Sequence, residues 1–231
     1  MGDCLAMQNL RALLLPLLAF AATPVSAETV IYETVEVTVY EAQAGSERFV
    51  QAAQPAAVPQ GIARFGPFRV LDGTRAALVD VTDEASPAQF AALLRAYPGV
   101  SMLELIDCPG TEDDRANLAV GRMIRARGIA THVPAGGSVR SGGVELFLAG
   151  TQRIADPGAE FAVHSWMDED GLEAQDYPAD APENRAYTDY YREMGMAPAQ
   201  ASAFYAMTNS VPHADARFLT ADDMGQWVRL D

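Results

Sequence analysis

The chain has 231 residues, of which 49% are hydrophobic, and its 31 acidic and 16 basic side chains give a formal net charge of −15. This length and composition are typical of a soluble globular protein with one domain, large enough to bury a core without disulfides or metal clusters. The basic residues are all arginines, which excludes lysine chemistry such as P-loop and Ser–Lys mechanisms. The acidic charge also disfavours nucleic acid as a partner, because that binding needs Lys and Arg to neutralise phosphates.

An apolar run over residues 12–22 lies near the N-terminus and is followed by the small residues Ser26 and Ala27. This pattern predicts a signal peptide over residues 1–27 that is cut after Ala27. The run is shorter than the about 20 residues of a membrane-spanning helix, so we expect no membrane contact after cleavage. The mature protein is therefore expected to be periplasmic or secreted. Translation from Met7 instead of the first methionine would give the signal a short basic start, and both starts stay open.

Cysteine usage points away from disulfides and metal sites. Cleavage removes Cys4 and leaves Cys108 as the single cysteine of the mature chain. We interpret Cys108 as a small buried hydrophobic residue, because free cysteine is among the most buried residue types. No cysteines and histidines have the spacing of a zinc site, and the acidic residues 168–170 lack the later ligands of a calcium loop. We expect neither a metal nor a cofactor.

Strands and helices alternate along residues 28–231, the expected domain. Alternating polarity over residues 29–40 predicts a first strand, and the Ala-, Gln- and Pro-rich stretch 42–66 predicts an irregular connection. Further strands are expected at residues 76–81, 102–106, 129–133, 153–155 and 160–163. Helices are expected at residues 86–97 with Ser86 as N-cap, 113–127 with Gly128 beyond its end, 142–149, 182–194, 198–207, and 221–226 behind Thr220. This order predicts an α/β fold with a largely parallel sheet, whose chemistry lies at the carboxyl ends of the strands.

Residues 166–191 form an acidic insertion with eight acidic side chains and one arginine, Arg185. We interpret it as a solvated loop that leads into a helix, with a lid over a cleft as the alternative. The large aromatic residues of this stretch are expected in the core or at an interface; they are Trp166, Tyr190 and Tyr191. Two other histidines are interpreted as structural or surface residues; they are His132 and His213.

Three features at expected strand ends suit acyl transfer. They are the Pro109-Gly110 turn, Ser141 at a Gly-rich turn into a helix, and His164 after a strand. A serine hydroxyl becomes a good nucleophile when a base takes its proton. Ser141 also precedes the first N–H groups of a helix, whose partial positive charge favours a developing oxyanion.

With these residues in view, the segment 103–166 resembles the proteolytic subunit of Clp proteases, within the larger crotonase-like fold. The similarity rests on Cys108-Pro109-Gly110-Thr111, on Ser141 to Gly150 with its Ala-Gly ending, on Ala162-Val163-His164, and separately on Arg217-Phe218-Leu219-Thr220. Residues 66–165 match best, and the chain looks most like the exported bacterial Clp-like branch, whose function is unsettled. The resemblance implies a single-domain Clp–crotonase fold, a ββα superhelix with a largely parallel sheet.

The resemblance also implies roles for particular residues. Ser141 would be the nucleophile and His164 the general base, and the N–H groups of Thr111 and Gly142 would form the oxyanion hole. Thr111 stands where the family has a glycine, so its side chain threatens to prevent a backbone conformation that glycine allows or to crowd the oxyanion site.

The third catalytic residue is a departure from the family pattern. Ala216 occupies the position of the catalytic Asp, and Asp215 lies one position earlier. Asp215 is the expected orienting acid, although a shift of one residue in extended chain turns a side chain to the other face. The substitutes that the sequence does not rank are Asp168, Asp170 and Tyr205.

The resulting functional hypothesis is an exported serine hydrolase or peptidase that acts by Ser-His(-Asp) acyl transfer. No ATPase segment is present, so it would act without ATP, on a peptide or a small ester or amide. The resemblance implies a homo-oligomer, because Clp and crotonase relatives assemble. One alternative is a catalytically inactive Clp-like protein for binding or assembly; another is a CoA-thioester activity of the crotonase kind, which export disfavours.

Overall fold

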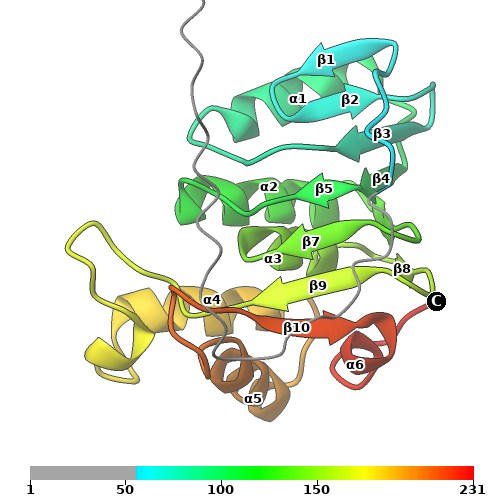
Figure 1. Ribbon diagram of the computed structural model, residues 1–231. Coiled ribbons are helices and arrows are strands. Elements are labelled where there is room, and N and C mark those ends of the chain that lie inside the picture. Colours follow the sequence, from blue (N-terminus) through cyan, green and yellow to red (C-terminus); the bar gives the residue numbers. More distant parts are fainter. Residues whose placement is uncertain (1–55) are drawn as a thin grey trace, which may run out of the picture. The chain divides into compact units, whose positions relative to one another are not determined.

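The computed structural model describes residues 56–231, so the expected signal peptide and the strand over residues 29–40 lie outside the described residues. The described part is an α/β fold with two sheets, of strand order β1-β2-β3-β4-β6-β8 and β10-β9-β7-β5, and helices packed against them (Figure 1). Most neighbouring strands run parallel; only β1 with β2, β2 with β3 and β9 with β10 are antiparallel. No helix in residues 56–231 has the length and hydropathy needed to cross a bilayer.

The strands are β1 Ala63–Phe65, β2 Phe68–Val70, β3 Arg75–Leu78, β4 Met102–Leu105, β5 Asp107–Cys108, β6 Ala130–Val133, β7 Ser138–Arg140, β8 Arg153–Ala155, β9 Glu160–Val163 and β10 Arg217–Thr220. The helices are α1 Ser86–Ala96, α2 Asp114–Ala126, α3 Gly142–Leu148, α4 Pro182–Glu193, α5 Pro198–Thr208, α6 Ala221–Gly225 and a short 3-10 turn, η1 Ala174–Asp176. The expected helices are therefore confirmed to within about one residue at each end, the margin within which helix boundaries vary.

A ββα repeat generates both sheets. β4, β6 and β8 join the six-stranded sheet, while β5, β7 and β9 join the four-stranded one, and α2 and α3 follow β5 and β7. The sequence predicted neither β5 nor β7, because they have two and three residues and include the polar Asp107 and Arg140. Two sheets therefore replace the single sheet expected from periodicity, with the expected parallel direction retained.

The expected irregular connection over residues 42–66 is wrong at its end. Residues 63–65 form β1, which pairs with β2 through a tight turn at Gly66-Pro67. Gly66 has φ +57°, a backbone conformation that glycine adopts without steric cost. A glycine at the first central position of a two-residue turn is a hairpin signal, and here it lies between two phenylalanines, Phe65 and Phe68.

The predicted residues at the end of α2 and at the start of α6 are confirmed, and the predicted N-cap of α1 is wrong. Gly128 follows α2 with φ +67°, and the Thr220 hydroxyl accepts a hydrogen bond from the Asp223 N–H at the start of α6. Ser86, however, is the first residue of α1 rather than its N-cap. Its hydroxyl accepts from the Asp83 N–H and donates to the Asp83 carboxylate, which fixes the preceding turn instead.

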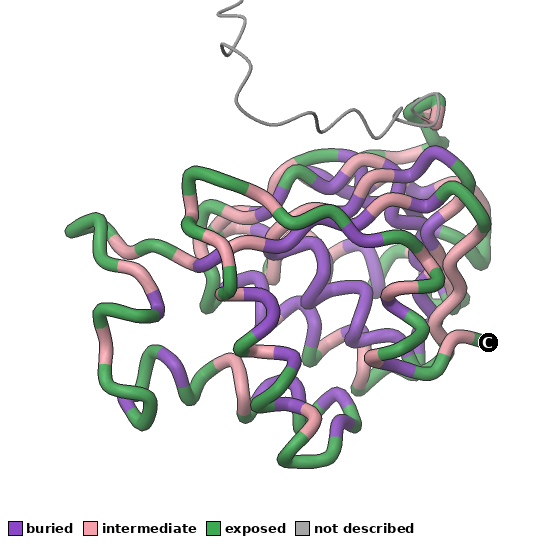
Figure 2. The backbone as a smooth tube through the Cα atoms, turned by 60° about the horizontal axis from the view of Figure 1, so that its bottom comes forward, coloured by how far each residue is buried: buried purple, intermediate pink, exposed green. Residues whose placement is uncertain are grey.

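The core lies between the sheets and the helices, and buried positions concentrate in the middle of the described region (Figure 2). Cys108 is fully buried there, as expected, and burial raises the pKa of its thiol. Phe147 of α3 packs on Phe161 of β9 with ring centroids 4.9 Å apart. This contact fixes α3 against the strand that precedes His164.

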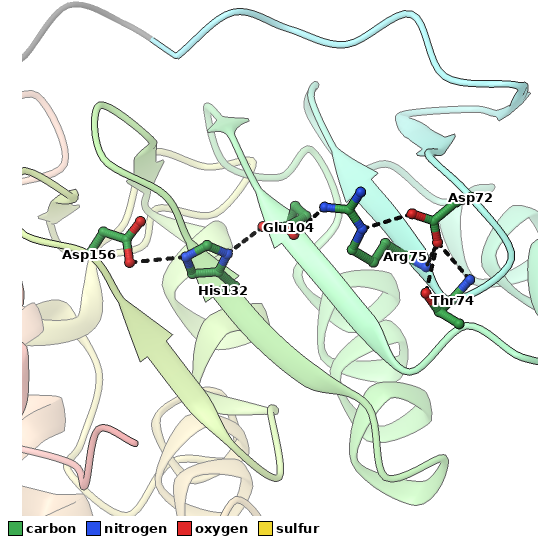
Figure 3. Close-up of polar contacts among 6 residues, drawn as sticks. All are labelled: Asp72, Thr74, Arg75, Glu104, His132 and Asp156. Carbon is green, nitrogen blue, oxygen red and sulfur yellow. Dashed lines mark hydrogen bonds and ion pairs between the residues drawn. The ribbon is translucent and has the colours of Figure 1, made fainter.

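A polar network crosses the six-stranded sheet and confirms that His132 is structural (Figure 3). His132 of β6 contacts Glu104 of β4 through Nδ1 at 2.5 Å and Asp156 through Nε2 at 3.2 Å. Glu104 is buried, and Arg75 reaches its other oxygen at 3.8 Å. The imidazole therefore supplies the near partner of a carboxylate that water hardly reaches.

We predict that His132→Ala lowers the free energy of unfolding by about 1–3 kcal/mol, because Glu104 loses its closest partner while it stays buried. Urea denaturation measures this change. The comparison variant is Arg75→Ala, which removes an exposed partner and should cost less than about 1 kcal/mol. Equal losses of unfolding free energy in His132→Ala and Arg75→Ala would contradict this prediction, because the burial of Glu104 would then not determine the loss.

Candidate functional site

A cavity of about 130 Å³ opens at the carboxyl ends of β5, β7 and β9, which run parallel in the smaller sheet. Its lining comprises Thr111, Glu112, Asp114, Ser141, Gly142, Glu145, Val163, His164, Trp166, Met167, Tyr187, Tyr191, Thr208, Asn209 and His213. Four of the five residues singled out in the sequence for catalysis are therefore in one place. Asp215 is the residue that the cavity does not include.

Ser141 joins β7 to α3 in a strained conformation. Its φ of +48° and ψ of −124° make it the one non-glycine residue with positive φ in residues 56–231. Such a conformation costs about 1–3 kcal/mol and persists only where the surrounding structure enforces it. Here the Ser141 N–H donates to the Ala162 carbonyl at 2.8 Å, which ties the turn to β9. A sharp strand-to-helix turn of this kind exposes a serine hydroxyl at the edge of a sheet.

The turn after β5 is fixed to Thr82. The Thr82 N–H donates to the Gly110 carbonyl at 3.2 Å, and the Thr111 hydroxyl donates to the Thr82 carbonyl at 3.1 Å. Gly110, with φ +138°, takes the unusual conformation, and Thr111 does not. The threonine side chain therefore does not disturb the backbone of this turn, because its hydroxyl donates to the Thr82 carbonyl and accepts from the Asp113 N–H.

Glycine is required at position 142 by close packing. A Cβ there would lie 2.7 Å from the Thr111 methyl carbon and 3.0 Å from Asn117 Nδ2. Asn117 donates from Nδ2 to the Gly142 carbonyl at 2.7 Å, and its Oδ1 accepts from the Thr82 hydroxyl at 2.9 Å. This buried chain of hydrogen bonds holds the turn after β5 against the start of α3.

Two backbone donors are left beside Ser141. Within residues 56–231, neither the Thr111 N–H nor the Gly142 N–H donates to a protein acceptor. Gly142 is the first residue of α3, where N–H groups have no partner within the helix. Two such donors on either side of a serine are suited to an oxyanion.

His164 directly follows β9, and a backbone carbonyl determines the tautomer of its neutral ring. Its Nδ1 lies 2.7 Å from the Ser165 carbonyl oxygen. A carbonyl can only accept, so Nδ1 carries the hydrogen, and the neutral ring has its lone pair on Nε2. The described residues contain no hydrogen bond between the Ser141 hydroxyl and this ring, so direct proton transfer requires the two groups to come closer.

Ser165 is itself held firmly. It is buried, its N–H donates to the Val211 carbonyl at 2.9 Å, and its hydroxyl donates to the Trp166 carbonyl at 3.2 Å. The acceptor for His164 is therefore a fixed feature of the fold. The sequence gives no signal for it, because any residue type supplies a carbonyl.

The residues named for the orienting role lie elsewhere. Asp215 is exposed, and its carboxylate accepts from the Ala216 N–H at 2.8 Å. Asp168 accepts from the Tyr177 hydroxyl and from nearby backbone N–H groups, while Asp170 is exposed. Tyr205 accepts from Trp166 Nε1 at 2.7 Å. None of these side chains lines the cavity within the described residues.

Other cavity residues were missed or misjudged in the sequence. His213 is not merely a surface or structural residue, since it lines the cavity with its ring 4.8 Å from that of His164 and edge-on to it. Trp166, Met167, Tyr187 and Tyr191 line the cavity as well, so the acidic insertion contributes to the site near both of its ends. The rest of that segment is mainly exposed, as expected of a surface loop (Figure 2).

Two carboxyl groups of the cavity titrate abnormally. Glu145, one helical turn after Ser141, is buried, and burial raises its pKa to about 7 although a hydrogen bond from the Tyr191 hydroxyl opposes this. Burial also raises the pKa of Asp114, and a hydrogen bond with Tyr187 lowers it in part. Asp114 as a whole residue is nevertheless exposed to solvent.

Glu145 makes stability depend on pH. Its pKa rises from 4.5 to about 7 on folding, so the folded state binds the extra proton between these values. The associated stability is present below pH 4.5 and is lost as the pH rises through 7, about 3 kcal/mol in all. We predict that Glu145→Gln, which keeps an acceptor for Tyr191, removes this part of the decline when urea unfolding is compared at pH 4.5 and 8. An unchanged pH dependence in the variant would contradict the assignment.

Comparison with known proteins gives likeness in structure only. The sequence matches no family model and no curated protein. A variant of ClpP1 from Listeria monocytogenes is 16% identical, with TM-score 0.49 over 68% of this chain and 88% of that one. Two variants of the 1510-N membrane-bound stomatin-specific protease are 16% and 15% identical, with TM-scores of 0.43 and 0.46. They cover 66% and 68% of this chain and 73% and 76% of theirs, and the first is in complex with a substrate peptide. Identities this low transfer no residue role to this chain.

Proposed function

We propose that the protein is a serine hydrolase of the Clp–crotonase kind that acts on a peptide or a small ester or amide through Ser141 and His164. One observation carries the proposal. A strained serine and a histidine whose Nδ1 is already bound to a carbonyl follow neighbouring parallel strands and line the same cavity. His164 Nε2 therefore has the lone pair and can act as the base that accepts the proton of the Ser141 hydroxyl.

The reaction has two halves. The Ser141 oxygen attacks the substrate carbonyl while its proton passes to His164 Nε2, and the Thr111 and Gly142 N–H groups hold the oxyanion. The leaving amine or alcohol takes the proton from His164 as its bond to the carbonyl carbon breaks. Water then attacks the acyl ester, again with its proton passing to His164, and that proton returns to Ser141 as the acid leaves.

The Ser165 carbonyl takes the orienting part that the sequence analysis gave to Asp215. It fixes the same tautomer that a carboxylate would fix, but it carries no full charge to stabilise the imidazolium. We therefore infer a Ser–His pair assisted by a backbone group. A full negative charge is that of Asp114, which lines the same cavity and interacts electrostatically with His164.

Localisation and assembly remain part of the proposal. Residues 12–22 and the small residues before position 28 support export with cleavage after Ala27. Homo-oligomer formation is proposed on the resemblance of residues 103–166 to Clp subunits. Peptide substrates are proposed on the same resemblance.

We predict that a fluorophosphonate probe labels the wild-type protein and that Ser141→Ala abolishes the labelling. His164→Ala should lower the labelling rate at least about 100-fold, as expected for loss of a general base. Labelling is measured by mass spectrometry of the intact protein, with Ser202→Ala, an exposed serine of α5, as the matched control. Absence of labelling in the wild type would favour the alternative of an inactive binding protein.

A further inference from the structure

We propose that the cavity selects substrates with a cationic group, a guanidinium or an ammonium, next to the carbonyl that Ser141 attacks. The inference rests on the proposed hydrolase function and names its substrate class. It begins from the charge of the lining. Three carboxyl side chains line the cavity, and no arginine of residues 56–231 does so.

The position of the carboxylates ties the cation to the reacting carbonyl. Glu145 is bound by the Tyr191 hydroxyl and Asp114 has a hydrogen bond with Tyr187, so Glu112 is the carboxylate of the lining that has no tyrosine partner among residues 56–231. Glu112 follows directly on Thr111, whose N–H is one of the two proposed oxyanion donors, and Asp114 lies three residues after Thr111. A cation that pairs with these carboxylates therefore lies in the same cavity as the carbonyl that Ser141 attacks.

A buried acceptor without a donor gives an independent indication. The Asn209 residue lines the cavity, and its Oδ1 is buried and accepts no hydrogen bond within residues 56–231. The amide orientation is fixed, because Nδ2 donates to the Tyr205 carbonyl at 2.8 Å. Buried acceptors are nearly always paired in native proteins, so this oxygen points to a ligand that donates N–H groups.

The size of the cavity limits the ligand. About 130 Å³ is well below the roughly 300–1,000 Å³ of sites that enclose a whole drug-sized molecule. One side chain therefore enters, and the remainder of the substrate stays outside. An arginine or lysine side chain on the acyl part of a peptide or ester meets these conditions of charge, donors and size.

The test compares thiobenzyl esters of Nα-acyl-arginine and Nα-acyl-citrulline, which have nearly the same shape and differ in charge. We expect kcat/KM to be at least about tenfold higher for the arginine ester, the factor of one charge-assisted hydrogen bond. Asp114→Asn and Glu112→Gln should each lower this ratio, whereas Asp180→Asn, which removes an exposed charge outside the cavity, should keep it. The ratio should also fall with added salt.

The outcomes distinguish failure of the cationic preference from failure of the hydrolase function. A ratio of one or less in a protein whose Ser141 is labelled by fluorophosphonate overturns the cationic preference and leaves the hydrolase function standing. An equal loss on both esters in Asp114→Asn, with no change of ratio in Glu112→Gln, overturns it too and assigns Asp114 to the histidines, on which its charge also acts. If Ser141 is not labelled, the hydrolase function itself fails.

Discussion

The chemistry of the cavity depends on one hydrogen bond, which His164 Nδ1 donates to the Ser165 carbonyl oxygen. Because that oxygen cannot donate, the bond decides which ring nitrogen carries the hydrogen and which has the lone pair. The bond is reliable because Ser165 is buried and its own N–H is held by the Val211 carbonyl. The base can thus be oriented by a carbonyl, while the charge that acts on the ring comes from Asp114 in the same cavity.

The second requirement is that the surrounding structure holds the strained backbone of Ser141. A serine with positive φ is unfavourable, and the structure maintains it through contacts with three different elements. Ala162 of β9 accepts from the Ser141 N–H, Asn117 of α2 donates to the Gly142 carbonyl, and Thr82 bonds to both Asn117 and the turn after β5. The ββα repeat makes this possible, because it brings the ends of β5, β7 and β9 side by side in the smaller sheet.

Much of the site could be predicted from the sequence because its parts are local. Ser141 lies before two glycines and an apolar helix, and His164 lies after an apolar strand, so each is indicated by its own neighbours in the sequence. The two short strands β5 and β7 could not be predicted, since two or three residues show no periodicity. The proximity of His213 to His164 and the role of the Ser165 carbonyl arise from tertiary packing, and no residue type announces either.

Thr111 shows that a residue which departs from a family pattern can leave the backbone of a turn undisturbed. The sequence placed a threonine where a flexible glycine was expected, but the unusual backbone angle belongs to Gly110. The threonine hydroxyl also adds two hydrogen bonds that steady the turn. Asp215 is the opposite case, since a plausible residue one position along the chain does not line the cavity.

The tautomer of His164 tests this account most directly. Nitrogen NMR of the histidine side chains at a pH where the ring is neutral distinguishes the two forms, and His164→Gln identifies the signal. The account predicts a hydrogen on Nδ1 and an unprotonated Nε2. A neutral ring with its hydrogen on Nε2 would have no lone pair on that nitrogen to accept the Ser141 proton. This result would contradict the account.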